Sequence, residues 1–260
     1  MADFVLARKS RNIASTTVHV FLNILLGIGA VLITVFSGNP LLGVILVILS
    51  KWRIFAVRSR YLWLSIKSNL VDLIVGLSIV FLAYYAGSSL MVVHFVLMAL
   101  YIIWLIILKP MSSETATLTQ SLVGVFLGIS ATTFITVSSD SFFAAITAFL
   151  IGYAASRHVL SQTNDKDFTL TTLVCGLIFS EVAWMCHSWS IVYTFGSTGI
   201  RIPQVALILT IFAFIYNYVR QTMVRRQEDF RFRDIIGPVM FGLLLVGIIV
   251  IWFSDPRFNI

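Results

Sequence analysis

The sequence predicts an all-α, polytopic integral membrane protein with about nine transmembrane helices. Of its 260 residues, 59% are hydrophobic and 11% are charged, and the mean hydropathy is +0.98. A soluble domain averages roughly 45–50% apolar and about 25% charged residues. A larger core does not explain the excess, because a soluble chain of this size still needs polar residues to cover its surface.

Nine apolar segments approach the length of about 20 residues that a spanning helix needs. Their predicted ranges are residues 18–36, 41–55, 69–86, 90–108, 119–137, 142–155, 168–190, 203–219 and 235–253. The second and sixth segments are short, and the second spans only if Lys51 and Arg53 extend outward along their aliphatic stems. A re-entrant pair formed by the first two segments is the alternative interpretation.

The distribution of charge predicts the orientation. With the N-terminus inside, every Lys and Arg except Arg201 and Arg257 falls on the inner side of the membrane. This asymmetry is what the positive-inside rule requires, and adding or removing one helix would destroy it. We therefore expect the N-terminus inside and the C-terminus outside, in the plasma membrane.

Short sequence patterns recur in the two halves of the chain. LGIGAVLITVFSGNP at Leu26–Pro40 resembles LGISATTFITVSSDS at Leu127–Ser141, and LVDLIVGL at Leu70–Leu77 resembles LTTLVCGL at Leu170–Leu177. They indicate a single membrane domain, residues 1–260, built from two parallel four-helix units and a ninth helix. The units cover residues 18–110 and 119–222, and the ninth helix covers residues 235–253. Chance matches among abundant Leu, Val, Ile and Gly are the alternative.

Glu181 is the most unusual polar residue, because it lies inside the predicted seventh span, slightly outward of its middle. Ionisable groups within spans are costly and usually face the interior or a cavity. Desolvation favours the neutral form of a buried carboxyl, which suits reversible proton binding. A protonated or paired Glu181 that ties helices together is the structural alternative.

His187 and His94 are further candidates for an intramembrane polar site with Glu181, since each lies near the outer end of its helix. Asp72 is a weaker candidate, because its position near the start of the third span favours a cap or an ion pair with the loop cations. Adjacent Cys186 and His187 diverge by about 100° on a helix, so we expect no metal site.

A basic and aromatic segment follows the second span. We expect it to lie at the inner interface, with its cations on anionic lipid headgroups and its aromatic rings at headgroup depth. The interfacial residues are Lys51, Trp52, Arg53, Arg58, Arg60 and Trp63. Because topology already explains the basic excess, we expect no nucleic-acid partner.

No catalytic or cofactor-binding motif occurs, so an enzyme is the less favoured interpretation and no cofactor is expected. The first hypothesis is a carrier for a small solute or ion, with Glu181 as a proton-linked site. The alternative is a structural or assembly subunit of a membrane complex. Its partners would be another membrane protein or further copies of this chain.

Overall fold

The computed structural model describes residues 2–52, 56, 58–87, 90–163, 167–188, 191–195, 198–226 and 229–251, with side chains from residue 17 onward except at 59 and 64. The helices are α1 (Ala2–Ser37), α2 (Pro40–Ser50), α4 (Ser59–Ser68), α5 (Leu70–Ala86), α6 (Met91–Ile103), the π-helix η1 (Trp104–Leu108), α7 (Glu114–Thr136), α8 (Ser141–Leu160), α9 (Phe168–His187), α10 (Gln204–Arg226) and α11 (Arg233–Ile251). The strands are β1 (Val192–Phe195) and β2 (Ile200–Pro203).

Within the described residues, seven helices are long and apolar enough to cross a membrane. They are Thr17–Ser37 of α1, Met91–Leu108, Glu114–Thr136, Ser141–Leu160, Phe168–His187, Gln204–Arg226 and Arg233–Ile251. An eighth span is formed if Arg60–Ser68 and Leu70–Ala86, which are bent by 61°, count as one. The protein is therefore a helical, multi-pass membrane protein.

The second predicted span differs from the observed helix. α2 has 11 residues and ends at Ser50, so it is about 16 Å long, roughly half of a 30 Å hydrocarbon core. The chain leaves the helix at Lys51, whose amide donates to the carbonyl oxygen of Ile48 at 2.9 Å. Residues 53–55, including Arg53, lie outside the described residues.

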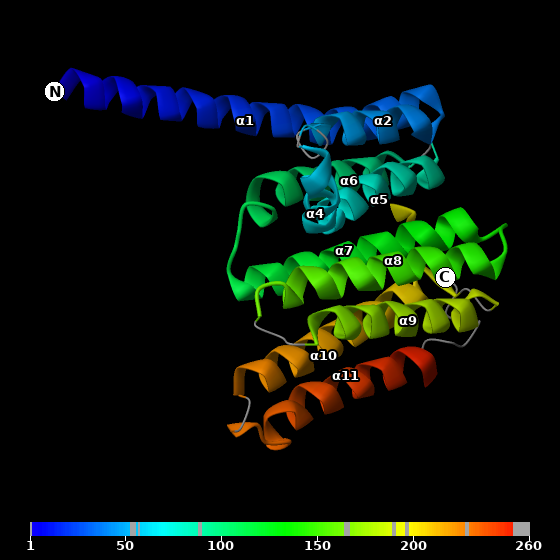
Figure 1. Ribbon diagram of the computed structural model, residues 1–260. Helices are drawn as coiled ribbons and strands as arrows, with labels where there is room; N and C mark the ends of the chain where they lie inside the picture. The colour runs from blue at the N-terminus through cyan, green and yellow to red at the C-terminus, as the bar shows by residue number, and fades with distance from the viewer. Residues whose placement is uncertain are drawn as a thin grey trace.

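The long helices lie alongside one another, and successive helices are connected at alternate ends of the molecule (Figure 1). The end at which α2, η1, α8 and α10 finish carries Lys51, Lys109, Arg157 and Arg225, and we call it the basic end. The opposite end holds the β1–β2 hairpin, and we call it the hairpin end. That the basic end faces inside the cell stays a prediction.

Two buried clusters divide the molecule. One joins α1, α2, α5 and α6 through residues such as Val47, Ile79 and Tyr101. The other joins α7, α8, α9 and α10 through residues such as Phe179 and Leu209. α7 lies against α5 between them, and Gly124 permits this approach, because a Cβ there would lie 2.9 Å from Val71 Cγ1.

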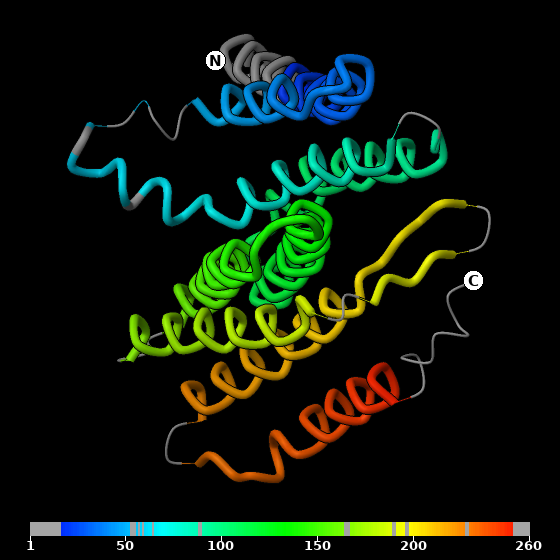
Figure 2. The backbone as a smooth tube through the Cα atoms, turned by 90° about the vertical axis from the view of Figure 1, so that its right-hand side faces the viewer, coloured from blue at the N-terminus to red at the C-terminus, as the bar shows by residue number. Residues whose placement is uncertain are grey.

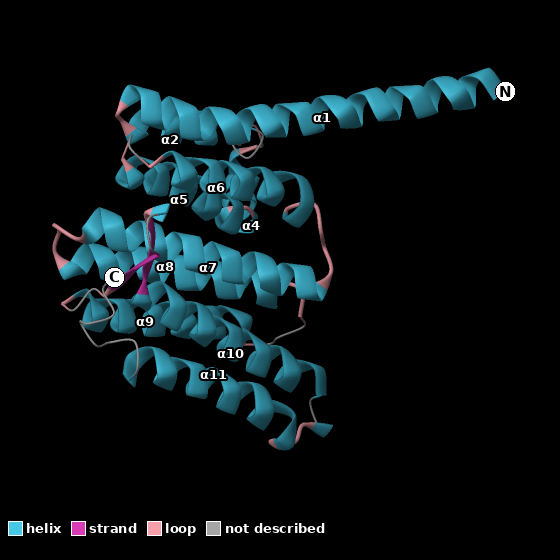
Figure 3. Ribbon diagram, turned by 180° about the vertical axis from the view of Figure 1, so that it is seen from behind, coloured by secondary structure: helices cyan, strands magenta, loops and turns pink. Residues whose placement is uncertain are grey.

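The segment between the seventh and eighth predicted spans forms an antiparallel hairpin. β1 pairs with β2 from Val192↔Pro203 to Phe195↔Ile200, and the β-branched and aromatic residues of both strands favour this conformation. Gly199 takes φ +71° and would place a Cβ 2.6 Å from Leu90 Cδ2. The hairpin projects beyond the start of α10 (Figure 2). It reaches Leu90, which precedes α6, and lies against α7 (Figure 3).

The neighbours of α1 and of α7, the first helices of the two predicted repeat units, can be compared. α1 packs against α2 and α6, and its counterpart α7 packs against α8 and α10. An overlay of the two four-helix units is the test of the repeat, which stays a prediction.

Candidate functional site

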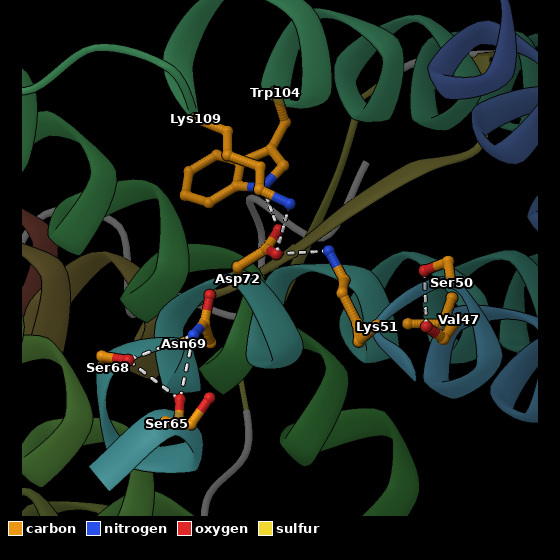
Figure 4. Close-up of polar contacts among 9 residues, drawn as sticks. All are labelled: Val47, Ser50, Lys51, Ser65, Ser68, Asn69, Asp72, Trp104 and Lys109. Atoms are coloured by element: carbon orange, nitrogen blue, oxygen red, sulfur yellow. Dashed lines mark hydrogen bonds and ion pairs between the residues drawn. The ribbon is translucent and has the colours of Figure 1, made fainter. Parts of the chain in front are cut away.

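A buried cluster of charged residues lies at the basic end, centred on Asp72 in the first turn of α5 (Figure 4). Asp72 Oδ2 accepts from Lys51 Nζ, at the end of α2, and from Lys109 Nζ, which lies 2.8 Å away at the end of η1. Asp72 Oδ1 accepts from Trp104 Nε1 at 3.0 Å. The side chain of Lys51 is 5% exposed and that of Asp72 is 9% exposed, whereas that of Lys109 is 40% exposed.

The π-turn explains how one short segment supplies two partners to Asp72. In a regular α-helix, residues five apart differ in direction by about 140°. The amide of Lys109 instead donates to the carbonyl oxygen of Trp104 at 2.8 Å, the five-residue bond of a π-helix. This wider turn brings the side chains of Trp104 and Lys109 to the same side of the helix, facing Asp72.

Both oxygens of the Asp72 carboxylate are thus occupied by donors, and two cations face one anion. A buried carboxylate held by three donors in this way joins α2, α5 and η1. We therefore interpret the cluster as a structural tie between helices. The sequence indicates an ion pair for Asp72, but the nearest cation along the chain, Lys67, lies over the ring of Trp63 at 4.9 Å instead.

A second polar contact lies at the same end. Gln120 of α7 donates through Nε2 to the carbonyl oxygens of Leu108 and Met111, the latter at 2.9 Å. Its Oε1 lies 2.7 Å from His158 Nε2 of α8. These bonds satisfy the carbonyl of Met111 and add a second donor to that of Leu108, which also accepts from the amide of Met111. They connect the end of η1 to α7 and α8.

Glu181 faces outward. Its side chain is exposed on α9, and it makes no hydrogen bond or ion pair with any residue that the structure describes. Leu177 and Trp184, one turn away on either side, are 55% and 59% exposed. α9 has 20 residues and is about 30 Å long, and Glu181 lies about 9 Å from the helix end at His187.

The two candidate histidines make separate contacts. His94 is buried at 7% exposure, and its Nε2 lies 3.1 Å from the carbonyl oxygen of Ala83 in α5. His187 is half-buried, and its Nε2 lies 3.2 Å from the carbonyl oxygen of Ser139, after α7. None of the cavities described below is lined by both histidines or by Glu181. In the described part of the chain, no group of three or more His, Cys, Asp or Glu residues is placed to hold a metal ion.

The predicted interfacial residues fall into two classes. Trp52 and Trp63 are 61% and 65% exposed, and Arg58 and Arg60 are also exposed, as an interfacial segment requires. Lys51 differs from the expectation, because its side chain turns into the protein to pair with Asp72 rather than outward to lipid. An unpaired Asp72 beneath the surface would be costly, and this explains the inward turn.

Three cavities bear on function. One of about 20 Å³ lies between α7, α8 and α9 and is lined by Thr132, Thr133, Thr136 and His187, among others. Two larger ones, of about 230 and 310 Å³, follow one another along α6 and α7. Comparison with protein-family models, with curated proteins and with solved structures gives no match.

Proposed function

We propose that the protein is a membrane protein that associates with itself. The outward face of α9 packs against the same face of a second copy. The observation that carries the proposal is the exposed carboxyl of Glu181 within an apolar span. A carboxyl facing lipid costs several kcal/mol unless it finds a partner, so intramembrane acids usually mark contacts or cavities.

The spacing of exposed residues on α9 suits helix pairing. Leu170, Val174, Leu177, Glu181 and Trp184 are all exposed and follow one another at intervals of four, three, four and three residues. This is the period of 3.5 residues that keeps one stripe of a helix against a partner helix. The stripe extends over about 21 Å, most of the length of a hydrocarbon core. We call these five residues the α9 stripe.

A second copy is the occupant that supplies the missing donor at the right depth. A two-fold axis along the membrane normal brings Glu181 of each copy to the same depth. The two carboxyls then face each other across the interface, where they can form a hydrogen bond. Polar pairs between transmembrane helices stabilise association by about 0.6 kcal/mol on average and up to about 2 kcal/mol.

Association of the purified full chain in liposomes tests the proposal. Single-molecule photobleaching at increasing dilution measures the fraction of dimer. We expect Glu181→Leu to weaken association roughly 3- to 30-fold, and we expect Glu181→Gln to retain it, since an amide both donates and accepts. Leu244→Ala, on the exposed face of α11, is the control and should have no effect. A monomeric wild-type chain, or equal association of the Glu181→Leu variant, would contradict the proposal.

A proton-linked carrier for a small solute or ion is the second candidate. It is favoured by the threonine-lined cavity beside His187, because its volume of about 20 Å³ holds about one water molecule. Glu181 lies on the same helix and is the second titratable group that such a carrier would use. Proton-driven solute uptake should then fail in Glu181→Gln and in His187→Gln while expression persists. Normal uptake in both variants would remove the carrier hypothesis.

A further inference from the structure

The two larger cavities are neighbours along α6 and α7, and we take them together as one path. The cavity of about 230 Å³ and that of about 310 Å³ share Leu100, Phe126 and Leu127 in their linings. Between Val93, at the hairpin end, and Leu108, at the basic end, the path follows about 22 Å of helix. We call this path the α6–α7 groove. It lies between the two helix groups, where α7 packs on α5 rather than closely on α6.

The lining of the groove is suited to a hydrocarbon chain. Most of its residues are Leu, Val, Ile and Phe, and a space of this size lined by apolar side chains does not retain water. An elongated apolar molecule fills such a groove with dispersion contacts on both sides. Its length of about 22 Å exceeds the roughly 15 Å of a single leaflet, so a long chain is accommodated.

Two polar groups at the hairpin end indicate a polar headgroup. Ser130 is 4% exposed, lines the groove, and its Oγ has no hydrogen-bond partner among the described residues. Arg201 of β2 also lines the groove at its mouth, and it forms no ion pair within the part of the chain that the structure describes. The cation gives this end of the groove a positive charge, which complements an anionic headgroup.

We propose that the α6–α7 groove binds a membrane lipid with a long hydrocarbon chain and an anionic headgroup. The chain lies along Leu100, Phe126 and Leu127, and the headgroup, a phosphate or a carboxylate, binds Arg201. Ser130 donates a hydrogen bond to an oxygen of the lipid beside the hydrocarbon chain, either an ester oxygen of a phospholipid or a carboxylate oxygen of a fatty acid. The site lies at the end opposite to the basic loops, so it is distinct from their contact with lipid headgroups, and it does not depend on self-association through the α9 stripe.

Photolabelling of the full chain in nanodiscs tests this site. The probes are phosphatidylglycerol, phosphatidylcholine and oleic acid, each with a diazirine in the hydrocarbon chain, and mass spectrometry locates the label. In the wild-type protein we expect label on peptides of α6 and α7. Phosphatidylglycerol should give about five-fold more label than phosphatidylcholine, because one cation near an anionic lipid contributes a factor of about this size. Stronger labelling by oleic acid than by phosphatidylglycerol would assign a carboxylate headgroup, and the reverse would assign a phosphate.

Four variants separate the headgroup contact from the groove. Arg201→Gln should reduce the labelling by phosphatidylglycerol to that by phosphatidylcholine, whereas Arg201→Lys should retain the preference. Leu100 is 45% exposed, so Leu100→Trp fills the groove from its edge and should reduce labelling of α6 and α7 by every probe at least five-fold. Leu244→Trp, on α11, should change nothing. Equal labelling of the wild type by the anionic lipids and phosphatidylcholine, or unchanged labelling in Leu100→Trp, would overturn the proposal.

Discussion

Substitution of Asp72 by asparagine removes the anion of the cluster at the basic end and leaves its two cations in place. The side chain of Lys51 is 5% exposed, so its ammonium group loses its counter-ion where water cannot replace it. The amide oxygen of the asparagine would still accept the hydrogen bond from Trp104. Its NH2 group cannot accept from Lys51 or Lys109, so the charge and these two bonds are lost together. Removal of one partner of a buried ion pair costs about 3–5 kcal/mol, and we expect Asp72→Asn to lower the free energy of unfolding by this amount.

The exposed fractions of Lys51 and Lys109 predict how much stability the other variants lose. The side chain of Lys109 is 40% exposed, so its pairing is worth about 1 kcal/mol or less, and Lys109→Met should be close to the wild type. Lys51→Met leaves Asp72 with Lys109 and Trp104, and its cost should fall between the other two. The double variant Lys51→Met/Asp72→Leu removes both buried charges and should recover most of the stability, since apolar residues often replace a buried pair without loss.

Reversible unfolding in mixed micelles of increasing denaturing detergent measures these free energies. We expect the order Asp72→Asn, Lys51→Met, Lys109→Met, from the largest loss to the smallest, with the double variant less destabilised than Asp72→Asn. A loss below about 1 kcal/mol in Asp72→Asn would show that the carboxylate is not a tie between α2, α5 and η1, and the interpretation of the cluster would be wrong.

Two further predictions use the same unfolding measurement. Gly152→Ala should lose about 1–3 kcal/mol, because the added Cβ would lie 2.5 Å from Phe179 Cγ, between α8 and α9. Gly247→Ala, with no atom within 4 Å of the added Cβ, should instead be neutral or gain up to about 1 kcal/mol. Equal effects of Gly152→Ala and Gly247→Ala would contradict the close packing of α8 against α9. Gln120→Leu should lose about 1–3 kcal/mol, because it leaves His158 and the carbonyl of Met111 without the partner that Gln120 provides. An unchanged stability would show that these bonds contribute little.

Much of the helical architecture follows from hydropathy alone. The apolar pattern predicts the third span over residues 69–86, and the structure has α5 over Leu70–Ala86. Boundaries set by local capping are predicted less accurately. α7 begins five residues before the predicted position, at Glu114, because Ser113 Oγ accepts from the amide of Ala116 at 3.2 Å and starts the helix among polar residues. Hydropathy does not locate a helix start that is set by a polar N-cap residue.

The site is less accessible to prediction, for two physical reasons. The partners of Asp72 are Lys51 and Lys109, which lie 21 and 37 positions away along the chain, and a π-turn with no sequence period of its own aims Lys109 at the carboxylate. Glu181 can be identified as unusual from the sequence, but its direction cannot, because a spanning helix is apolar on the faces toward both lipid and protein. Only the positions of α8 and α10 show that Glu181 faces outward.

Cysteine cross-linking across the α9 stripe distinguishes an associating chain from a monomeric one. Leu177 lies at the middle of the stripe and is 55% exposed, and the native Cys186, which is half-buried, is replaced by serine. In native-like membranes under mild oxidation, we expect Leu177→Cys to give a covalent dimer, and Leu244→Cys, similarly exposed on α11, to stay monomeric. Cross-linking of both positions to the same extent, or of neither, would contradict self-association through α9.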